Sequence, residues 1–315
     1  MKGYERSAAH TVATGTPAVG EGRPERSTAA AEVPPAPRGA RLRSFLRRAA
    51  VWIPVAALVI WTMAPFLISI SVSFKQPATV FANPGLIPEH FTLDAYSRVL
   101  ERPGFRTALW NSIVIGLGSL VITLLLGVPA AYAFARFRFR GRHLLLLFSL
   151  LPMLIPKVGL MVPLYRLAVL LDAIDSRLFL IVVFTGMLLP LATWLMVGFF
   201  QAIPRDLEEA AAVDGASLLQ TLRTIVLPLS LPALITVSVL AFREAWNEFE
   251  LVLALTQSTE ARTLPYELFL MQTAVGIGDF PLENAFALLT VLPLILVYLR
   301  IERYVTQGLL TGSVK

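Results

Sequence analysis

A short polar stretch interrupts an apolar region near the C-terminal end of the chain. Within "AFREAWNEFE" (residues 241–250), Arg243 and Asn247 are four positions apart, and so are Glu244 and Glu248. On a helix this spacing brings the paired side chains onto one face, so they form a polar stripe. In a membrane, each charge costs at least about 2.5 kcal/mol unless it is paired or wetted. The stretch is therefore predicted either to line a polar passage or to pair inside the membrane and fix helix packing.

A single lysine interrupts another apolar stretch. Lys157 lies in "LLPMLIPKVGLMVPL" with prolines on both sides, so a helix here is expected to be kinked. The ammonium group can reach a cavity, or it can extend along the helix to the membrane interface. The sequence favours the second interpretation.

Residues that could perform catalysis or bind metal are scarce. The chain has no cysteine, and its histidines, at positions 10, 90 and 143, do not have the spacing of a zinc site. It also has no glycine-rich loop followed by Lys and Ser or Thr, so it has no phosphate-binding loop for ATP. We therefore expect no enzymatic activity, no metal and no bound cofactor, and any ATP must be used by another chain.

The elements that carry these residues are predicted to be membrane helices. Hydrophobic residues make up 56% of the 315, and charged residues only 15%. A spanning helix needs about 20 predominantly apolar residues, and six segments approach or exceed that length. Three segments carry no charge: Ala49–Phe74, Thr107–Ala135 and Leu178–Pro204. Three are shorter or contain charges: Leu144–Leu170, Leu229–Leu255 and Ala285–Leu299. The fold class is thus predicted to be all-α, with six transmembrane helices. The glycines of "IGLGSLVITLLLG" in the second span are expected to serve close helix packing.

Basic residues near the span ends predict the orientation. "RLRSFLRR" precedes the first span, and "ARFRFRGRH" joins the second and third, so these ends are expected to face the cytoplasm. With six spans, both termini and the loop between the fourth and fifth spans are then cytoplasmic. The net charge of +6 derives largely from these segments, and their arginines are expected to orient the spans and contact anionic lipid, not nucleic acid.

The chain is predicted to have two regions. Residues 1–40 are rich in Ala, Gly, Pro, Ser and Thr and should form a disordered cytoplasmic arm. The apolar segment that follows is as long as a full span and has no cleavage site, so it is interpreted as an uncleaved anchor. Residues 45–315 are assigned to the six-span membrane domain.

The loop between the fourth and fifth spans is predicted to form two short helices. Pro204 suits a first helical turn, and acidic residues follow it at the positive end of the helix dipole. The alanines at 210–212 favour a helix and let another protein approach closely. Gly215 suits the left-handed position that ends this helix. Ser217 and Gln220 have the spacing of a capping box, so a second helix should follow at once.

The same loop contains a complete sequence motif. Glu209-Ala210-Ala211 is followed after three residues by Gly215, after nine more by Ile225, and after one more by Leu227-Pro228. From about residue 45 to 315 the chain resembles membrane subunits of binding-protein-dependent ABC importers, in which this pattern is the EAA motif. "FTLDAYSRVL", "WNEF" and "GLLTGSVK" are similar to the carbohydrate-uptake group and its maltose-type second membrane subunit.

The resemblance implies that the loop at about residues 203–228 couples the membrane domain to a cytoplasmic ATPase. The expected ATPase-coupling residues are Glu209, Ala210, Ala211, Asp214, Gly215, Ile225, Leu227 and Pro228. The alternative is that two short capped helices merely link two spans. The polar stripe is expected to contribute to the translocation path or to subunit packing, through Arg243, Glu244, Trp246, Asn247 and Glu248, with the Trp246 ring stacking on a sugar.

The resemblance also implies partners and cargo. The expected assembly contains a sister permease, two ATPase subunits that use ATP, and an extracytoplasmic solute-binding protein, in the cytoplasmic membrane of a prokaryote. Its expected cargo is a sugar or related polyol. Two alternatives stay open: the same importer architecture with an amino acid, peptide or anion as cargo, and an ion-coupled secondary transporter.

Overall fold

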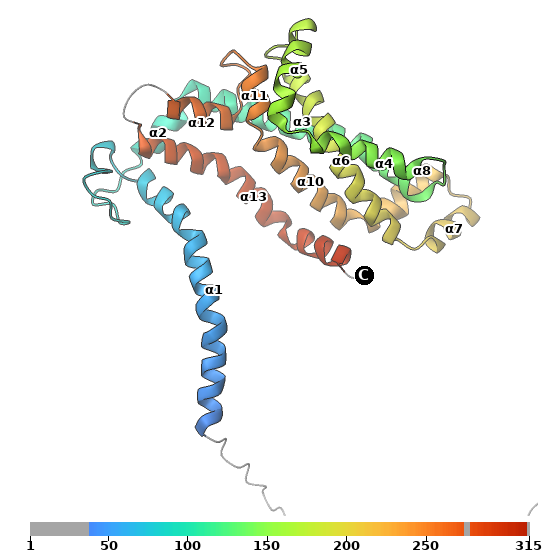
Figure 1. Cartoon of the computed structure of the whole chain (residues 1–315), viewed down its shortest axis with the longest axis horizontal. Helices are drawn as coiled ribbons and strands as arrows, with labels where there is room; N and C mark the ends of the chain where they lie inside the picture. Colours follow the sequence, from blue (N-terminus) through green and yellow to red (C-terminus); the bar gives the residue numbers. More distant parts are fainter. Residues whose placement is uncertain (1–37, 274–277, 314–315) are drawn as a thin grey trace, which may run out of the picture. The chain divides into compact units, whose positions relative to one another are not determined.

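The computed structural model describes residues 38–273 and 278–313, with side-chain surroundings for residues 48–273 and 278–302. Every regular element in these ranges is helical, which confirms the all-α prediction for that part of the chain (Figure 1). The chain divides into two compact units, residues 1–59 and 60–315. The described residues of the first unit belong to helix α1 (Arg38–Ser73). Residues 1–37 of the predicted arm lie outside the described residues.

Within residues 38–273 and 278–313, four helices are long and apolar enough to cross a membrane. They are α1, α3 (Pro103–Arg136), α6 (Arg177–Ala202) and α13 (Phe280–Ser313). The three charge-free segments of the sequence fall in α1, α3 and α6, and the sixth predicted segment falls in α13. Two bent helix pairs also qualify if each counts as one span, so the described residues contain four to six spans. The predicted number of six is the upper end of this range.

The third predicted span, Leu144–Leu170, is broken. Helix α4 (Arg142–Leu150) continues into the 3-10 turn η2 (Leu151–Leu154), and α5 (Lys157–Leu170) follows at an angle of 93°. The backbone of Ile155 is extended, with φ −83° and ψ 123°. The residue before a proline avoids the helical region, and Pro156 has no N–H to continue the hydrogen-bond ladder. The expected kink is thus a bend of 93° between two separate helices.

The fifth predicted span differs from the structure at both ends. The helical segment α8 (Leu218–Thr221), η3 (Leu222–Val226) and α9 (Leu227–Leu229) is bent by 78° from α10 (Leu231–Trp246). Pro232 has no N–H for the carbonyl of Pro228, so the ladder breaks there. Helix α10 then ends at Trp246, whereas the prediction continued to residue 255, and α11 (Glu250–Leu255) begins separately. That part of the prediction is wrong: residues 247–249 are not helical, and the Glu248 side chain accepts a hydrogen bond from the Leu251 amide in the first turn of the separate helix α11.

The remaining helices lie at the two ends of the second unit. Figure 1 shows α7 and α8 at one end, and α2 and α12 at the other. Helix α7 covers Asp206–Val213, α2 covers Asp94–Glu101, α12 covers Leu264–Thr273, and the 3-10 turn η1 covers Pro77–Thr79. Helix α3 has 34 residues and extends for about 50 Å at 1.5 Å per residue, which is enough to reach both groups.

Glycines on α3 allow close packing against α6 and α10. A Cβ atom added to Gly118 would lie 2.8 Å from Ile181 Cδ1, and one added to Gly116 would lie 3.0 Å from Phe242 Cε2. Neither contact is compatible with an undisturbed side chain. The prediction that these glycines serve helix packing is confirmed.

We expect Gly118→Leu to lower the free energy of unfolding by about 1–3 kcal/mol, because the new side chain overpacks the interface with Ile181. Thermal unfolding of the purified chain in detergent measures this loss. Gly198→Leu on α6 is the matched control, since an added Cβ there has nothing within 4 Å. Equal unfolding midpoints for the two variants would contradict the packing role of Gly118.

Candidate functional site

The first candidate site is the loop of residues 203–228, which we call the EAA loop. Helix α7 ends in a Schellman motif: the Gly215 amide donates to the Ala212 carbonyl at 3.1 Å, and the Ala216 amide donates to the Ala211 carbonyl at 2.9 Å. Gly215 has φ +84°, the left-handed conformation expected from the sequence. The local pattern of Asp214 and Gly215 therefore ends the helix as predicted.

The second half of the EAA loop starts with the expected capping box. The Ser217 amide donates to Gln220 Oε1 at 2.7 Å, and the Gln220 amide donates to Ser217 Oγ at 3.4 Å. Only one residue, Ala216, separates Gly215 from this cap, so α7 and α8 meet in a hard bend. Leu227 packs against a buried apolar cluster that includes Val226, which anchors this half to the helix bundle. Ile225 is half-buried and Pro228 is exposed.

The EAA loop presents an exposed face. Glu209, Ala210 and Ala212 are exposed, while Ala211 is buried. Apolar side chains accompany them, with Val213 88% and Leu218 54% exposed. A cavity of about 330 Å³ adjoins this face and is bordered by Glu208 and Glu209. The loop thus combines a fixed backbone with an acidic and apolar surface, the arrangement that suits docking of another protein.

The second candidate site is a cavity of about 270 Å³ among α5, α6 and α10. Its charged lining consists of Lys157, Glu244 and Glu248, and the remainder includes Phe184 and Met187. Lys157 Nζ donates to Glu248 Oε2 at 2.7 Å and lies 3.8 Å from Glu244 Oε2. The favoured interpretation of Lys157 as an interface residue is therefore wrong: it pairs with the polar stripe.

The members of the polar stripe have different surroundings. The Glu248 side chain is 5% exposed and uses both oxygens, one for Lys157 and one for the Leu251 amide. Glu244 is 41% exposed and also pairs with Arg243 at 2.7 Å. Asn247 donates to the carbonyl of Arg243, one turn earlier. Glu248 thus joins α10, α11 and α5, whereas Glu244 leaves part of its carboxylate open to the cavity.

Trp246 requires a correction. Its side chain is 1% exposed and packs in the cluster that contains Phe105 and Phe286, with the Phe242 ring 5.4 Å away. A ring enclosed by apolar side chains has no free face, so in this structure Trp246 is a core residue and is not placed to stack on a sugar. The sequence placed it within the polar stripe, but its helical position turns it to the other side.

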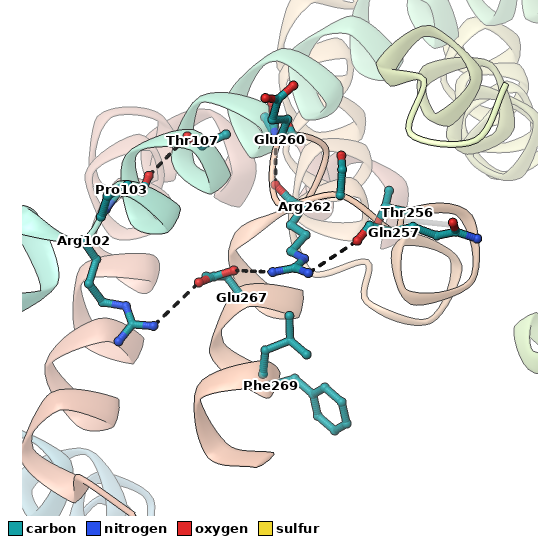
Figure 2. Close-up of polar contacts among 12 residues, drawn as sticks. Arg102, Pro103, Thr107, Thr256, Gln257, Glu260, Arg262, Glu267 and Phe269 are labelled. Atoms are coloured by element: carbon teal, nitrogen blue, oxygen red, sulfur yellow. Dashed lines mark hydrogen bonds and ion pairs between the residues drawn. The ribbon is translucent and has the colours of Figure 1, made fainter. Parts of the chain in front are cut away.

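A third polar group lies at the far end of α3 (Figure 2). Figure 2 shows the Glu267 carboxylate between Arg102 and Arg262. Its Oε1 lies 4.0 Å from Arg102 Nη2, and its Oε2 lies 3.7 Å from Arg262 Nη1. Glu267 is buried beside the N-terminus of α3, where an added Cβ on Gly104 would lie 2.6 Å from its Oε1. Asn111 of α3 donates to the carbonyls of Glu260 and Arg262. These contacts fix the segment of residues 256–273 to α3.

One pKa shift outside the spans belongs to the same end of the unit. The Asp279 carboxylate accepts a hydrogen bond from Arg98 and so raises the pKa of that guanidinium above its ordinary value. Arg98 also pairs with Asp94 at 2.8 Å. The pair keeps α2 next to the start of α13.

Comparison with known proteins decides the family. Residues 123–310 match the family described as binding-protein-dependent transport system inner membrane component, and the match includes the whole EAA loop and the polar stripe. The chain belongs to this family. As a family member it is a multi-pass component of the inner membrane, and not the enzyme of the transport system.

The chain matches individual relatives over nearly their whole length. The chain is 34% identical over 272 residues to the trehalose/maltose transport system permease protein MalG of Thermococcus litoralis, covering 86% of this chain and 98% of the relative. It is 36% identical over 280 residues to the trehalose transport system permease protein SugB of Mycobacterium tuberculosis, covering 85% and 98%. A solved bacterial ABC transporter involved in alginate import matches with a TM-score of 0.73 and 25% identity, covering 86% of this chain and 99% of that chain.

Some residues of this membrane component escaped sequence reasoning. Tyr132 and Arg136 at the end of α3 contact Glu208, and Lys157 contacts the polar stripe. The four-residue spacing of Tyr132 and Arg136 at a helix end was the available signal, but their partner Glu208 lies more than 70 positions away.

Among the residues that the structure describes, no group of three or more His, Asp or Glu side chains is placed to hold a metal ion.

Proposed function

We propose that the chain is the permease subunit of an ATP-driven importer and that the EAA loop is its ATPase-coupling element. The observation that carries this proposal is the exposed face of α7, whose C-terminal end is fixed by the Schellman motif and by the capping box that starts α8 directly after it. A coupling element must transmit the motion of the ATPase to the membrane helices. Its backbone therefore has to be rigid, and its outer face has to stay accessible to the ATPase. The chain would then assemble with a sister permease, two ATPase subunits and a solute-binding protein.

The proposed orientation places the EAA loop and both termini in the cytoplasm. The basic segments "RLRSFLRR" and "ARFRFRGRH" support it, because positive residues are retained on the cytoplasmic side. The same orientation places the Glu267 group outside, where a solute-binding protein would approach. Residues 45–315 constitute the membrane domain in this proposal.

The proposed cargo is a sugar or related polyol. Two relatives named as trehalose permeases, one of them also for maltose, support a neutral saccharide. In the cavity, one lysine faces two glutamates, so a large anion finds no excess of positive charge. We propose that Glu244 contributes to the translocation path and that Glu248 fixes the packing of α10. The alternative cargo is an amino acid, peptide or anion, within the same architecture.

Purification from the native membrane tests this function. The proposal requires a co-purifying ATPase subunit and a solute-binding protein that binds a saccharide in a ligand panel. A chain that purifies with neither partner, or that transports without ATP in liposomes, would contradict it. Binding of an amino acid, peptide or anion instead would replace only the cargo.

We expect Glu209→Ala to reduce retention of the ATPase by about tenfold or more, because an exposed carboxylate can accept a charge-assisted hydrogen bond from a basic residue of the partner. The amount of ATPase that co-purifies with the detergent-solubilised complex measures this effect. Membrane insertion and association with the sister permease should stay unchanged. Gln220→Ala, which removes only part of the capping box, is the control and should retain most of the ATPase. Equal retention for both variants would argue against docking through Glu209.

A further inference from the structure

We propose that the two adjacent glutamates of the EAA loop have separate tasks: Glu208 is a positioning residue that ties α7 to the end of α3, and Glu209 is left for the partner. This inference rests on the proposed coupling function. Neither the family match nor the relatives' names distinguish the two glutamates. The contacts of Glu208 carry the proposal.

Both oxygens of the Glu208 carboxylate face α3. The Tyr132 hydroxyl donates to Oε2 at 2.7 Å, and Arg136 Nη2 forms a close ion pair with Oε1 at 2.5 Å. The side chains of Arg136 and Glu208 are only 8% and 13% exposed. An ion pair that is largely shielded from water is screened little by salt, so it constrains the two helices more than a surface pair would.

The same arginine also holds the end of α6. Arg136 Nη2 donates to the carbonyl of Ile203 at 3.0 Å, directly after α6 ends at Ala202. Tyr132 and Arg136 are four residues apart and lie on one face of α3. We call the group of Tyr132, Arg136, Glu208 and the Ile203 carbonyl the Glu208 clasp. It joins the first turn of α7 to the ends of two long helices.

Glu209 differs from Glu208 in its exposure to solvent and in its polar contacts. Its side chain is exposed, and the described residues provide no ion pair or hydrogen bond for its carboxylate. Consecutive residues on a helix point about 100° apart, so one glutamate can face α3 while the next faces outward. The shared cavity of about 330 Å³ borders both residues.

The clasp gives the EAA loop a direct mechanical connection. A displacement of α7 by a partner would move the Arg136 end of α3 instead of being lost in the flexing of a loop. The other end of α3 is held by the group around Glu267 and Asn111. A single rigid element therefore connects the EAA loop to the opposite end of the unit.

The test uses the complete reconstituted transporter in proteoliposomes and compares ATPase retention with solute uptake per ATP hydrolysed. Glu208→Gln and Arg136→Glu should retain the ATPase, while uptake per ATP falls about tenfold, which is within the usual range of coupling effects. The exchange variant Glu208→Arg/Arg136→Glu should recover part of the coupling. Asp206→Asn is the matched control, because it removes another acid from the first turn of α7 without touching the clasp, and it should behave like the parent.

A second measurement is independent of transport. The chain has no cysteine, so spin labels at Val213→Cys and Arg140→Cys would report the distance between α7 and the segment that directly follows α3 in the purified full chain. Glu208→Gln should broaden this distance distribution, and Glu209→Gln should leave it unchanged. An unchanged distribution for Glu208→Gln would overturn the clasp.

The outcomes separate this inference from the proposed function. If Glu208→Gln loses the ATPase as Glu209→Gln does, while the label distances stay narrow, Glu208 is a docking residue and the clasp is overturned. If no variant of the loop alters ATPase retention or coupling, the proposed coupling function fails. In that case a broadened distance for Glu208→Gln would still support the structural contact.

Discussion

Gly215→Val is expected to abolish most solute uptake while the chain still inserts into the membrane. Gly215 has φ +84°, and a left-handed backbone costs an ordinary residue roughly 1–2 kcal/mol and a β-branched residue more. An added Cβ would have nothing within 4 Å, so the cost arises from the backbone and not from a collision. To relieve this strain, the backbone must break the hydrogen bond that the Ala216 amide donates to the Ala211 carbonyl. Loss of this hydrogen bond would change the angle between α7 and α8. Uptake and solute-stimulated ATP hydrolysis in proteoliposomes measure the effect.

A conservative substitution separates backbone strain from other causes. Gly215→Asn should keep most of the activity, because asparagine enters the left-handed region at a smaller cost. Uptake in the order glycine, asparagine, valine would support the strain argument. Parental uptake by Gly215→Val would mean that the bend does not position the coupling element, and the EAA loop would then be a structural link only.

The second large effect is expected at Glu248. Glu248→Ala should lower the free energy of unfolding by about 3 kcal/mol, the lower end for breaking a buried ion pair, because the Lys157 side chain is 38% exposed. The change removes the closer of the two carboxylates beside the Lys157 ammonium, with only Glu244 left at 3.8 Å, and leaves the Leu251 amide without its acceptor. Unfolding of the purified chain, followed in detergent by denaturant titration, gives the difference directly.

Two further variants test the origin of this loss. Glu244→Ala should cost less than about 1 kcal/mol, because Glu244 is 41% exposed and 3.8 Å from Lys157. The double variant Lys157→Met/Glu248→Gln should recover part of the stability lost in Glu248→Ala, since it leaves no buried charge unpaired. If Glu244→Ala and Glu248→Ala destabilise the chain equally, the distinction between a packing residue and a cavity residue does not hold.

The sequence predicted some membrane helices more accurately than others. Long uncharged runs identify α1, α3 and α6 because the cost of burying charge in lipid acts on each helix separately. The broken third and fifth spans were less predictable. Proline indicates a break, but the angles of 93° and 78° depend on what the two halves pack against.

The polar contacts also differ in how far they could be predicted: local motifs were predicted, and contacts between distant residues were not. Gly215, Ser217 and Gln220 were predicted in their observed roles, because Schellman motifs and capping boxes form between residues a few positions apart. The partner of Lys157 is 91 positions away, and the partner of Tyr132 is 76 positions away. Spacing along the chain carries no signal for such pairs. The same limit made Trp246 look like part of a polar stripe, although it packs into the core.

The amino-acid sequence by itself determined which segments are membrane helices, where α7 ends and α8 begins, and that the EAA loop carries a complete motif. Those features depend on local hydrogen bonds and on the transfer of apolar segments out of water, which act on neighbouring residues. Only the tertiary structure decided that Glu208 faces Arg136 while Glu209 stays exposed, and that Glu248 rather than Glu244 holds Lys157. The physical reason is that burial and ion pairing depend on which helix faces meet, and these are set by the packing of α3 against α6 and α10 and of α5 against α11.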